Sequence, residues 1–343
     1  MKKGITLAGN LIVDHNKEVD TYPGHSTLVS INRTFDTLGG LVCNSGIGLA
    51  RLDENLPVHA LGLVGNDSDG DYIISQMKKY PNINCDQIFR GNTQTSFSDV
   101  IADVTNHTRT FFSFKGTNSE LGPEHFDFDK IETDILHIGY ILLLDKLDSF
   151  DAEFGTKMAR VLHDAQAAGI KTSIDVVTEQ SDRFQKIVPH SVKYTDYCIL
   201  NEEEASRTVG IEVRNSSGQL LVDVCKELCQ KLFDLGVKEW VVIHAREGGI
   251  GLDNKGNFAV KPALNIPSEK IKGTTGAGDA FLSGVLYGAW KGYSIEKSVE
   301  LGIGTSNASI IEEGPTNGIL PENEIWDFYN SMEKETWPGF EQF

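Results

Sequence analysis

The sequence predicts a three-layer α/β fold, in which helices cover both faces of a central, mostly parallel β-sheet. Apolar runs of strand length alternate with segments of helical periodicity, and this alternation is typical of βα units. Glycine accounts for 34 of the 343 residues, which indicates many tight turns and close backbone approaches. One region, residues 95–114, breaks the alternation and predicts a small separate β-sheet. We expect residues 1–343 to form a single α/β domain with this β-sheet as a lid.

The strands of the central sheet are predicted from short runs of apolar and aromatic residues. These runs cover residues 5–11, 58–64, 135–140, 170–177, 197–200 and 240–244. Helices are predicted where apolar residues recur every three to four positions. These segments cover residues 43–52, 71–79, 150–168, 217–235, 277–291, 294–313 and 322–333. Asp69, which precedes the second of them, is interpreted as a helix N-cap.

The lid is predicted from two segments with the period of a β-strand. Residues 97–103 and 108–114 have the two-residue periodicity of β-strands, and the turn-forming pair Asn106-His107 joins them. Residues 19–34 predict a second strand pair that turns at Pro23-Gly24. We expect the lid to comprise about residues 15–34 and 95–114 and to lie over the carboxyl edge of the central sheet, where ligands of such sheets bind. An edge hairpin without a function is an equally good interpretation.

Charge and composition exclude several classes of protein. Lys and Arg number 31 and Asp and Glu 49, so the net charge is −18, which disfavours binding to nucleic acids or to anionic membranes. The apolar run 5–13 is interrupted by Asn10 and ended by Asp14, so it predicts a first strand rather than a signal peptide. Five cysteines are an odd number and a poor disulfide framework. We therefore expect a cytoplasmic protein without a nucleic-acid or membrane partner.

The strongest local signal is the sequence Gly-Thr-Thr-Gly-Ala-Gly-Asp-Ala-Phe at residues 273–281, a loop that runs directly into a helix. Gly276, Ala277 and Gly278 lack bulk, so the N–H groups of the helix N-terminus can close on an anion, above all a phosphate. Asp279 in the first turn is stabilised in its ionised form. A carboxylate beside an anion hole is what phosphorylation of an alcohol needs, because the carboxylate deprotonates the hydroxyl while the N–H groups hold phosphoryl charge. The alternative is a glycine-rich turn in which Asp279 only favours the helix dipole.

This string resembles the C-terminal signature of the ribokinase/PfkB family of carbohydrate kinases, usually written D-T-x-G-A-G-D. A second block is similar to the N-terminal signature of that family. It comprises Leu38-Gly39-Gly40 with Asn44, Ala50-Arg51-Leu52, and Gly62-Leu63-Val64-Gly65-Asn66-Asp67 with Gly70. Further matches lie at residues 9–14, Arg109-Thr110, Asn118, Asn201-x-x-Glu204 and residues 247–249. The resemblance implies a ribokinase-like fold and ATP-dependent phosphorylation of a hydroxymethyl group on a sugar or sugar-like substrate.

The resemblance also implies a role for each matching residue. Asp279 would be the catalytic base, with Gly276, Ala277 and Gly278 as the anion hole. The residues implied for the sugar are Asp14, Gly39, Gly40, Asn44, Arg109 and Asp145. Those implied for the ATP are Asn201, Thr274, Gly248 and Asn307. Glu204 would position Mg²⁺ through water, which suits an ion that keeps its hydration shell; alternatively, Glu204 is a solvated helix residue, Asn307 a buried cap and Arg109 a surface charge.

Three positions depart from the family pattern. Gly273 replaces the first aspartate of the C-terminal signature, which puts a monovalent-cation site in doubt and predicts weak activation by potassium. Leu41 stands where ribokinases often have a pocket lysine, which argues against ribose as the substrate. Arg246 replaces a common glycine before the nucleotide loop, and it either alters adenine contacts or adds a positive charge near phosphate.

Two other functions remain open from the sequence. A nucleoside kinase shares both signatures, and an aromatic clamp in the substrate pocket would favour it. A non-catalytic sugar-binding or regulatory protein could have kept the fold. The lid carries four phenylalanines, more than a solvated hairpin should expose, so we hypothesise that one lid face closes over the sugar while another pairs with a second subunit in a homodimer. They are Phe97, Phe111, Phe112 and Phe114.

Overall fold

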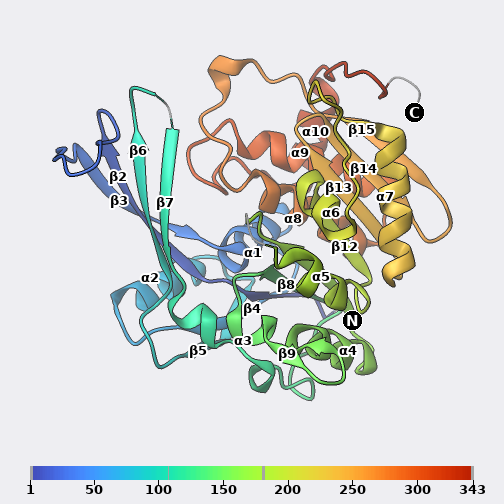
Figure 1. Cartoon of the computed structure of the whole chain (residues 1–343), viewed down its shortest axis with the longest axis horizontal. Helices are drawn as coiled ribbons and strands as arrows, with labels where there is room; N and C mark the ends of the chain where they lie inside the picture. Colours follow the sequence, from blue (N-terminus) through green and yellow to red (C-terminus); the bar gives the residue numbers. More distant parts are fainter. Residues whose placement is uncertain (1–2, 107, 180–181, 341–343) are drawn as a thin grey trace.

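A computed structural model describes residues 3–106, 108–179 and 182–340, and within them the chain forms a nine-stranded central sheet (Figure 1). The strand order is β15-β14-β13-β12-β11-β8-β1-β4-β5. All neighbours from β13 to β5 are parallel, whereas β13, β14 and β15 pair antiparallel. The strands are β1 (Ile5–Gly9), β4 (Val58–Val64), β5 (Ile83–Arg90), β8 (Ile135–Ile141), β11 (Lys171–Val176), β12 (Tyr197–Asn201), β13 (Trp240–Ala245), β14 (Gly248–Asp253) and β15 (Phe258–Pro262).

Helices pack on both faces of this sheet, as predicted. Successive strand residues point to opposite faces, so that Val241 and Ile243 join one apolar core and Val242 joins the other. The first core packs against α3 (Asp145–Asp148), α4 (Lys157–Ala167), α5 (Phe184–Val192), α6 (Glu202–Val209) and α7 (Val222–Leu235). The second packs against α1 (Leu41–Leu52), α2 (Ser68–Met77), α8 (Ala277–Lys291), α9 (Ile295–Ser309) and α10 (Glu322–Ser331). None of the helices in the described part of the chain is long and apolar enough to cross a membrane.

The lid is a four-stranded sheet that stands to one side of the core, at the left of Figure 1. Its strands are β2 (Ile12–Val19), β3 (Arg33–Gly39), β6 (Phe97–Asp103) and β7 (Thr108–Phe114), in the order β3-β2-β6-β7. The strands β6 and β7 have the predicted bounds, although His107 in their predicted turn lies outside the described residues.

The first lid pair differs from the prediction. The prediction of a strand pair within 19–34 is wrong, because its strands lie at 12–19 and 33–39 and residues 20–32 connect them. The predicted strand 5–11 ends early, at Gly9, whose φ is +128°. A Cβ there would lie 1.7 Å from the carbonyl oxygen of Gly139, so glycine allows the chain to leave the core and continue as β2.

The bounds of other helices also differ from the prediction, for local reasons. The helix predicted over 150–168 begins at Lys157, where Thr156 caps it, and residues 150–156 contain a small hairpin. The helix predicted over 217–235 begins at Val222. The N-cap of α2 is Asp67, whose carboxylate accepts from the Gly70 N–H, and not Asp69.

Candidate active site

The predicted glycine loop does end at a helix N-terminus, and α8 has the predicted bounds. Gly276 is the N-cap with φ of +81°, and a Cβ there would lie 2.4 Å from the Pro315 side chain. Asp279 lies in the first turn and is only 6% exposed. No carbonyl within α8 accepts from the N–H groups of this first turn. The Ala277 N–H, predicted for the anion hole, donates to the Thr274 carbonyl at 3.2 Å, so the N–H groups of Gly278 and Asp279 are the ones available to an anion.

Two side chains hold the carboxylate of Asp279. The Asn44 amide donates to Oδ2 at 2.9 Å, and the Tyr140 hydroxyl lies 2.8 Å from Oδ1 and 2.9 Å from Oδ2. Burial raises the pKa of Asp279, whereas these two hydrogen bonds lower it. Asn44 was predicted at this site, although for the sugar. Tyr140 was not predicted, since no motif includes it.

A group of buried acidic residues lies beside Asp279. Asn201 and Glu204 cap α6 reciprocally: the Glu204 N–H donates to the Asn201 side chain at 2.8 Å, and the Asn201 N–H donates to Glu204 Oε2 at 3.1 Å. Glu204 is 4% exposed, so it is not a solvated helix residue. Burial raises its pKa to about 7. Burial, with the charges of Glu204 and Asp279, also raises the pKa of Asp175 at the end of β11, which the sequence analysis missed.

No three acidic, histidine or cysteine side chains in the described part of the chain lie close enough together to hold a metal ion by themselves. The carboxylates of Asp175 and Glu204 offer two hard oxygen ligands of the kind that suits Mg²⁺, so the remaining ligands of such an ion would come from water or from a bound substrate.

A cavity of about 490 Å³ opens on one side of the α8 N-terminus. Five residues predicted for the nucleotide or the anion hole line it together: Gly248, Thr274, Ala277, Gly278 and Asn307. Gly248 has φ of +147°, and a Cβ would lie 2.1 Å from the Lys261 carbonyl oxygen. The Asn307 amide accepts from the Leu264 N–H and donates to the Ile303 carbonyl, so this side chain also braces the wall of the cavity. We call it the nucleotide cavity, after the role that the sequence analysis predicts for the residues lining it.

Arg246 lines the same cavity. Its guanidinium carbon lies 5.6 Å from the centre of the Trp337 ring. This departure from the family pattern therefore places a positive charge at the nucleotide cavity.

A second cavity, of about 330 Å³, lies between the lid and the loop before α8, and we call it the lid cavity. Asp14, Arg109 and Thr275 line it. Burial raises the pKa of Asp14 to about 6, although the charges of His15 and Arg109 lower it. The Arg109 guanidinium donates to Thr275 Oγ1 at 3.0 Å, so this residue joins the lid to the anion-hole loop.

Gly39 and Gly40, both predicted at this site, leave room for the Asp14 side chain and for the Asn10 carbonyl. A Cβ on Gly39 would lie 2.6 Å from Asp14 Oδ2, and a Cβ on Gly40, whose φ is +82°, would lie 2.5 Å from the Asn10 carbonyl oxygen. Leu41 is buried in the core at the start of α1, and so it presents no polar group to a substrate.

Five residues of β2 and β3 that the sequence analysis did not single out also line the lid cavity. They are Asn16, Glu18, Arg33, Phe35 and Thr37. They lie at alternate positions of β2 and β3, as residues on one face of a sheet must. The sequence analysis expected the first lid pair within residues 19–34. That range leaves out most of β2 and β3, so the alternation was not recognised.

Of the six residues predicted for the sugar, Gly39, Gly40, Asn44 and Asp145 do not line the lid cavity. Asp145, the first residue of α3, forms an ion pair with Lys115 and lines neither cavity. Asn44 lines a separate cavity of about 280 Å³ on the other side of β3.

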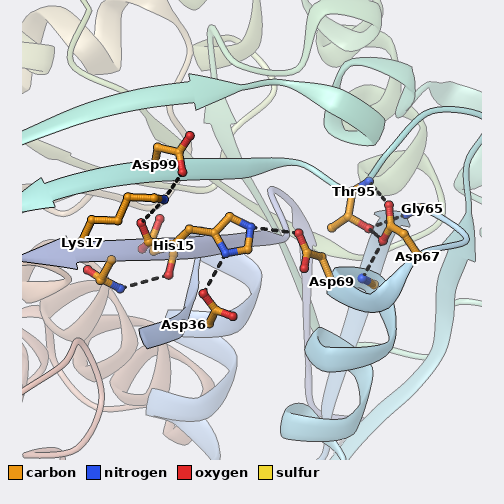
Figure 2. A network of polar contacts seen from close by, with 11 residues as sticks. His15, Lys17, Asp36, Gly65, Asp67, Asp69, Thr95 and Asp99 are labelled. Carbon is orange, nitrogen blue, oxygen red and sulfur yellow. Dashed lines mark hydrogen bonds and ion pairs between the residues drawn. The ribbon is translucent and has the colours of Figure 1, made fainter. Parts of the chain in front are cut away.

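His15 connects the lid to the core, as Figure 2 shows. Its Nδ1 lies 2.8 Å from Asp36 Oδ1 on β3, and its Nε2 lies 3.0 Å from Asp69 Oδ2 on α2. Partial burial lowers the pKa of His15, but the hydrogen bonds and charges of the two carboxylates outweigh this, so the pKa lies above its ordinary value. On the same lid face, Lys17 pairs with Asp99.

We expect His15→Asn to destabilise the protein more at pH 6 than at pH 9. A histidine whose pKa is raised on folding contributes stability that is fully present below its unfolded pKa of about 6.5 and is lost as pH rises through the folded value. Urea unfolding at both pH values measures this. His25→Asn, in the exposed connection between β2 and β3, is the control. An equal loss at both pH values would contradict the prediction.

The comparisons with known proteins decide the family. The family model described as "pfkB family carbohydrate kinase" matches residues 3–323. The chain belongs to the pfkB family of carbohydrate kinases. This pfkB family kinase is 22% identical to the 5-dehydro-2-deoxygluconokinase of Clostridium perfringens, with 98% of this chain and 95% of that protein covered. It is 24% identical to the adenosine kinase of Saccharomyces cerevisiae, with 84% and 82% covered.

Among solved structures, the pfkB family kinase resembles the ribokinase of Arabidopsis thaliana complexed with ribose and ATP. The TM-score is 0.79 at 18% identity, with 96% of this chain and 99% of that chain covered. The ribokinase-like fold predicted from the sequence is therefore confirmed.

Proposed function

We propose that this kinase transfers the γ-phosphoryl group of ATP to a hydroxymethyl group of a sugar or sugar-like substrate. The observation that carries the proposal is the position of Asp279. It lies buried at the α8 N-terminus, and this terminus lies between the nucleotide cavity and the lid cavity. The names of the relatives support a phosphoryl acceptor that is a small alcohol.

In the proposed reaction the acceptor hydroxyl gives its proton to the Asp279 carboxylate while its oxygen bonds to the γ-phosphorus. The bond from that phosphorus to the ADP oxygen breaks. The N–H groups around Gly276 and Gly278 stabilise the charge on the phosphoryl oxygens. Asp175, Asn201 and Glu204 would hold Mg²⁺, which when bound neutralises phosphate charge. Arg109 and Asp14 orient the acceptor from the lid.

A nucleoside is the second candidate substrate, and a specific observation favours it. The aromatic rings of Phe35 and Phe111 line the lid cavity, as a binding site for a nucleobase would require. The guanidinium of Arg33 lies 4.6 Å from the centre of the Phe35 ring. The likeness to an adenosine kinase agrees with this candidate.

A coupled ADP-release assay against a panel of sugars and nucleosides distinguishes the candidates. A sugar substrate should raise ADP release well above the rate with ATP alone, and the Asp279→Asn variant should abolish that increase. Preference for nucleosides would select the second candidate. ADP release that no compound increases, together with measurable sugar binding, would support a non-catalytic sugar-binding protein instead.

We also propose a homodimer that forms through the outer face of the lid. Phe112 and Phe114 are 54% and 41% exposed. They lie on the face opposite to Arg109 and Phe111, because side chains alternate along β7. Light scattering at micromolar concentration should show a dimer, and Phe112→Ser with Phe114→Ser should dissociate it. A strict monomer in the unmodified protein would reject the pairing but not the enzymatic function.

We expect only weak activation by potassium, because Gly273 supplies no carboxylate to a monovalent cation. Nearby Glu312 pairs with Lys272 at 2.8 Å. Replacing sodium by potassium at constant ionic strength should change kcat only a few-fold, less than about 1 kcal/mol of barrier. Gly273→Asp should increase the response, since a Cβ there would meet only Arg109, at 4.0 Å. A strong potassium dependence of the unmodified enzyme would refute this interpretation.

A further inference from the structure

The family motifs do not explain the hydroxyl of Tyr140, which contacts the carboxylate of Asp279. It comes from β8, 139 residues away from Asp279 in the sequence, and lies within hydrogen-bond distance of both carboxylate oxygens. The backbone fixes its position. The Tyr140 N–H donates to Asn10 Oδ1 at 2.6 Å, and the Asn10 N–H donates to the Gly139 carbonyl at 3.0 Å. Asn10 is itself buried, so its side chain is enclosed by the core.

We propose that Tyr140 is a positioning residue whose hydroxyl donates to Asp279 and keeps that buried carboxylate ionised and able to act as a base. This inference rests on the proposed role of Asp279. It goes beyond that role, because it names the group that makes a buried aspartate usable.

The surroundings of Asp279 show why such a donor is needed. Burial favours the neutral carboxylic acid, and the nearest acidic groups, Asp175 on β11 and Glu204 on α6, add negative charge from a neighbouring part of the sheet edge. Cys43 on α1 is buried with its pKa raised, so it stays neutral. His244 on β13 is also buried, and burial lowers its pKa to about 4. None of these four groups supplies a positive charge to Asp279 near neutral pH.

Besides the N-terminus of α8, the groups that favour the ionised carboxylate are therefore the two hydrogen-bond donors Asn44 and Tyr140. Asn44 donates to one oxygen only, whereas the phenol reaches both. The Tyr140 hydroxyl remains protonated, because burial and the charge of Asp279 raise its pKa well above the ordinary value. It is thus a donor near neutral pH, and the carboxylate is its acceptor.

The test is the variant Tyr140→Phe, which keeps the ring and removes only the hydroxyl. Loss of the hydrogen bond to the ionised carboxylate should raise the pKa of Asp279 by about one unit or more. We measure this pKa directly from the pH titration of the ¹³Cγ signal in protein labelled at aspartate, where Asp279 is assigned as the signal missing from Asp279→Asn. The acidic limb of the kcat/KM profile should move to higher pH, and activity should recover toward the wild-type value on the alkaline side.

Tyr287→Phe is the matched control. Tyr287 lies on the same helix α8, and its hydroxyl also contacts two carboxylates, at 2.9 Å for Asp53 and 2.8 Å for Glu322. Its removal should leave the titration of Asp279 and the acidic limb unchanged. Should Tyr140→Phe fail to fold, a ring-fluorinated tyrosine at position 140, a stronger donor, should shift the titration in the opposite direction.

The outcomes separate this inference from the proposed function. An unchanged Asp279 titration in Tyr140→Phe, or an equal shift in Tyr287→Phe, would overturn the role of Tyr140. Normal turnover in Asp279→Asn would instead overturn the role of Asp279 as the base, whatever the titration shows.

Discussion

Replacing Asp279 by asparagine is expected to lower kcat by about a hundredfold or more, the usual contribution of a general base. The asparagine keeps the size of the side chain and cannot accept the proton of the acceptor hydroxyl. Its neighbours Asn44 and Tyr140 remain in place to hold it. Steady-state kinetics with the substrate identified by the ADP-release panel measures the loss.

ATP binding should survive this substitution, because the backbone N–H groups at the α8 N-terminus are unchanged. Isothermal titration with a non-hydrolysable ATP analogue checks it. Asp53→Asn removes another carboxylate that contacts α8, through Tyr287, and should leave kcat within a few-fold of the wild type. Near-normal turnover in Asp279→Asn would remove this residue from the mechanism.

Asp14→Ala is expected to raise the KM for the acceptor tenfold or more, while the KM for ATP changes little. Hydrogen bonds from sugar hydroxyls to a charged carboxylate contribute about 1.5–3 kcal/mol each, and one such bond corresponds to at least tenfold in affinity. Asp14 lines the lid cavity and is absent from the lining of the nucleotide cavity. Initial rates over both substrate concentrations give the two KM values.

Asp99→Ala provides the control for this second prediction. Asp99 lies on β6 in the same lid sheet, adjacent to His15 across the strand, but on the face away from the lid cavity. Its removal breaks only the pair with Lys17. Equal increases in the KM for acceptor and ATP after Asp14→Ala, or none in either, would contradict the assignment of Asp14 to the acceptor.

Local signals were enough to predict the elements that carry the motifs. The strands β6 and β7 and the helix α8 have their predicted bounds, since alternation and a glycine-to-helix transition are encoded within a few residues. The strand β14 and its neighbour β15 were missed. The glycines of β14 dilute its apolar pattern, yet they are needed there: a Cβ on Gly249 would lie 2.7 Å from the Val299 side chain of α9.

The site was only partly predictable, for a different reason. Asp279, Asn201 and Glu204 belong to motifs, so the sequence could single them out as candidates. Tyr140 and Asp175 are brought to Asp279 by the pairing of β8 with β11, and no local pattern records that register. Asp145 was predicted only from the family resemblance, and in the structure it pairs with Lys115 instead.

The position of β1 between β4 and β8 has a consequence for how the chain folds. The pairing of β1 with β8 joins residues 5–9 to residues 135–139, and the parallel pairing of β2 with β6 joins 13–19 to 97–103. Closing loops of this length costs entropy before any contact forms, and such non-local pairing slows folding. During synthesis, more than a hundred residues must therefore follow β1 before β8, its second neighbour in the sheet, has been made. We expect fragments that end before β8 to expose the apolar edge of β1 and to aggregate.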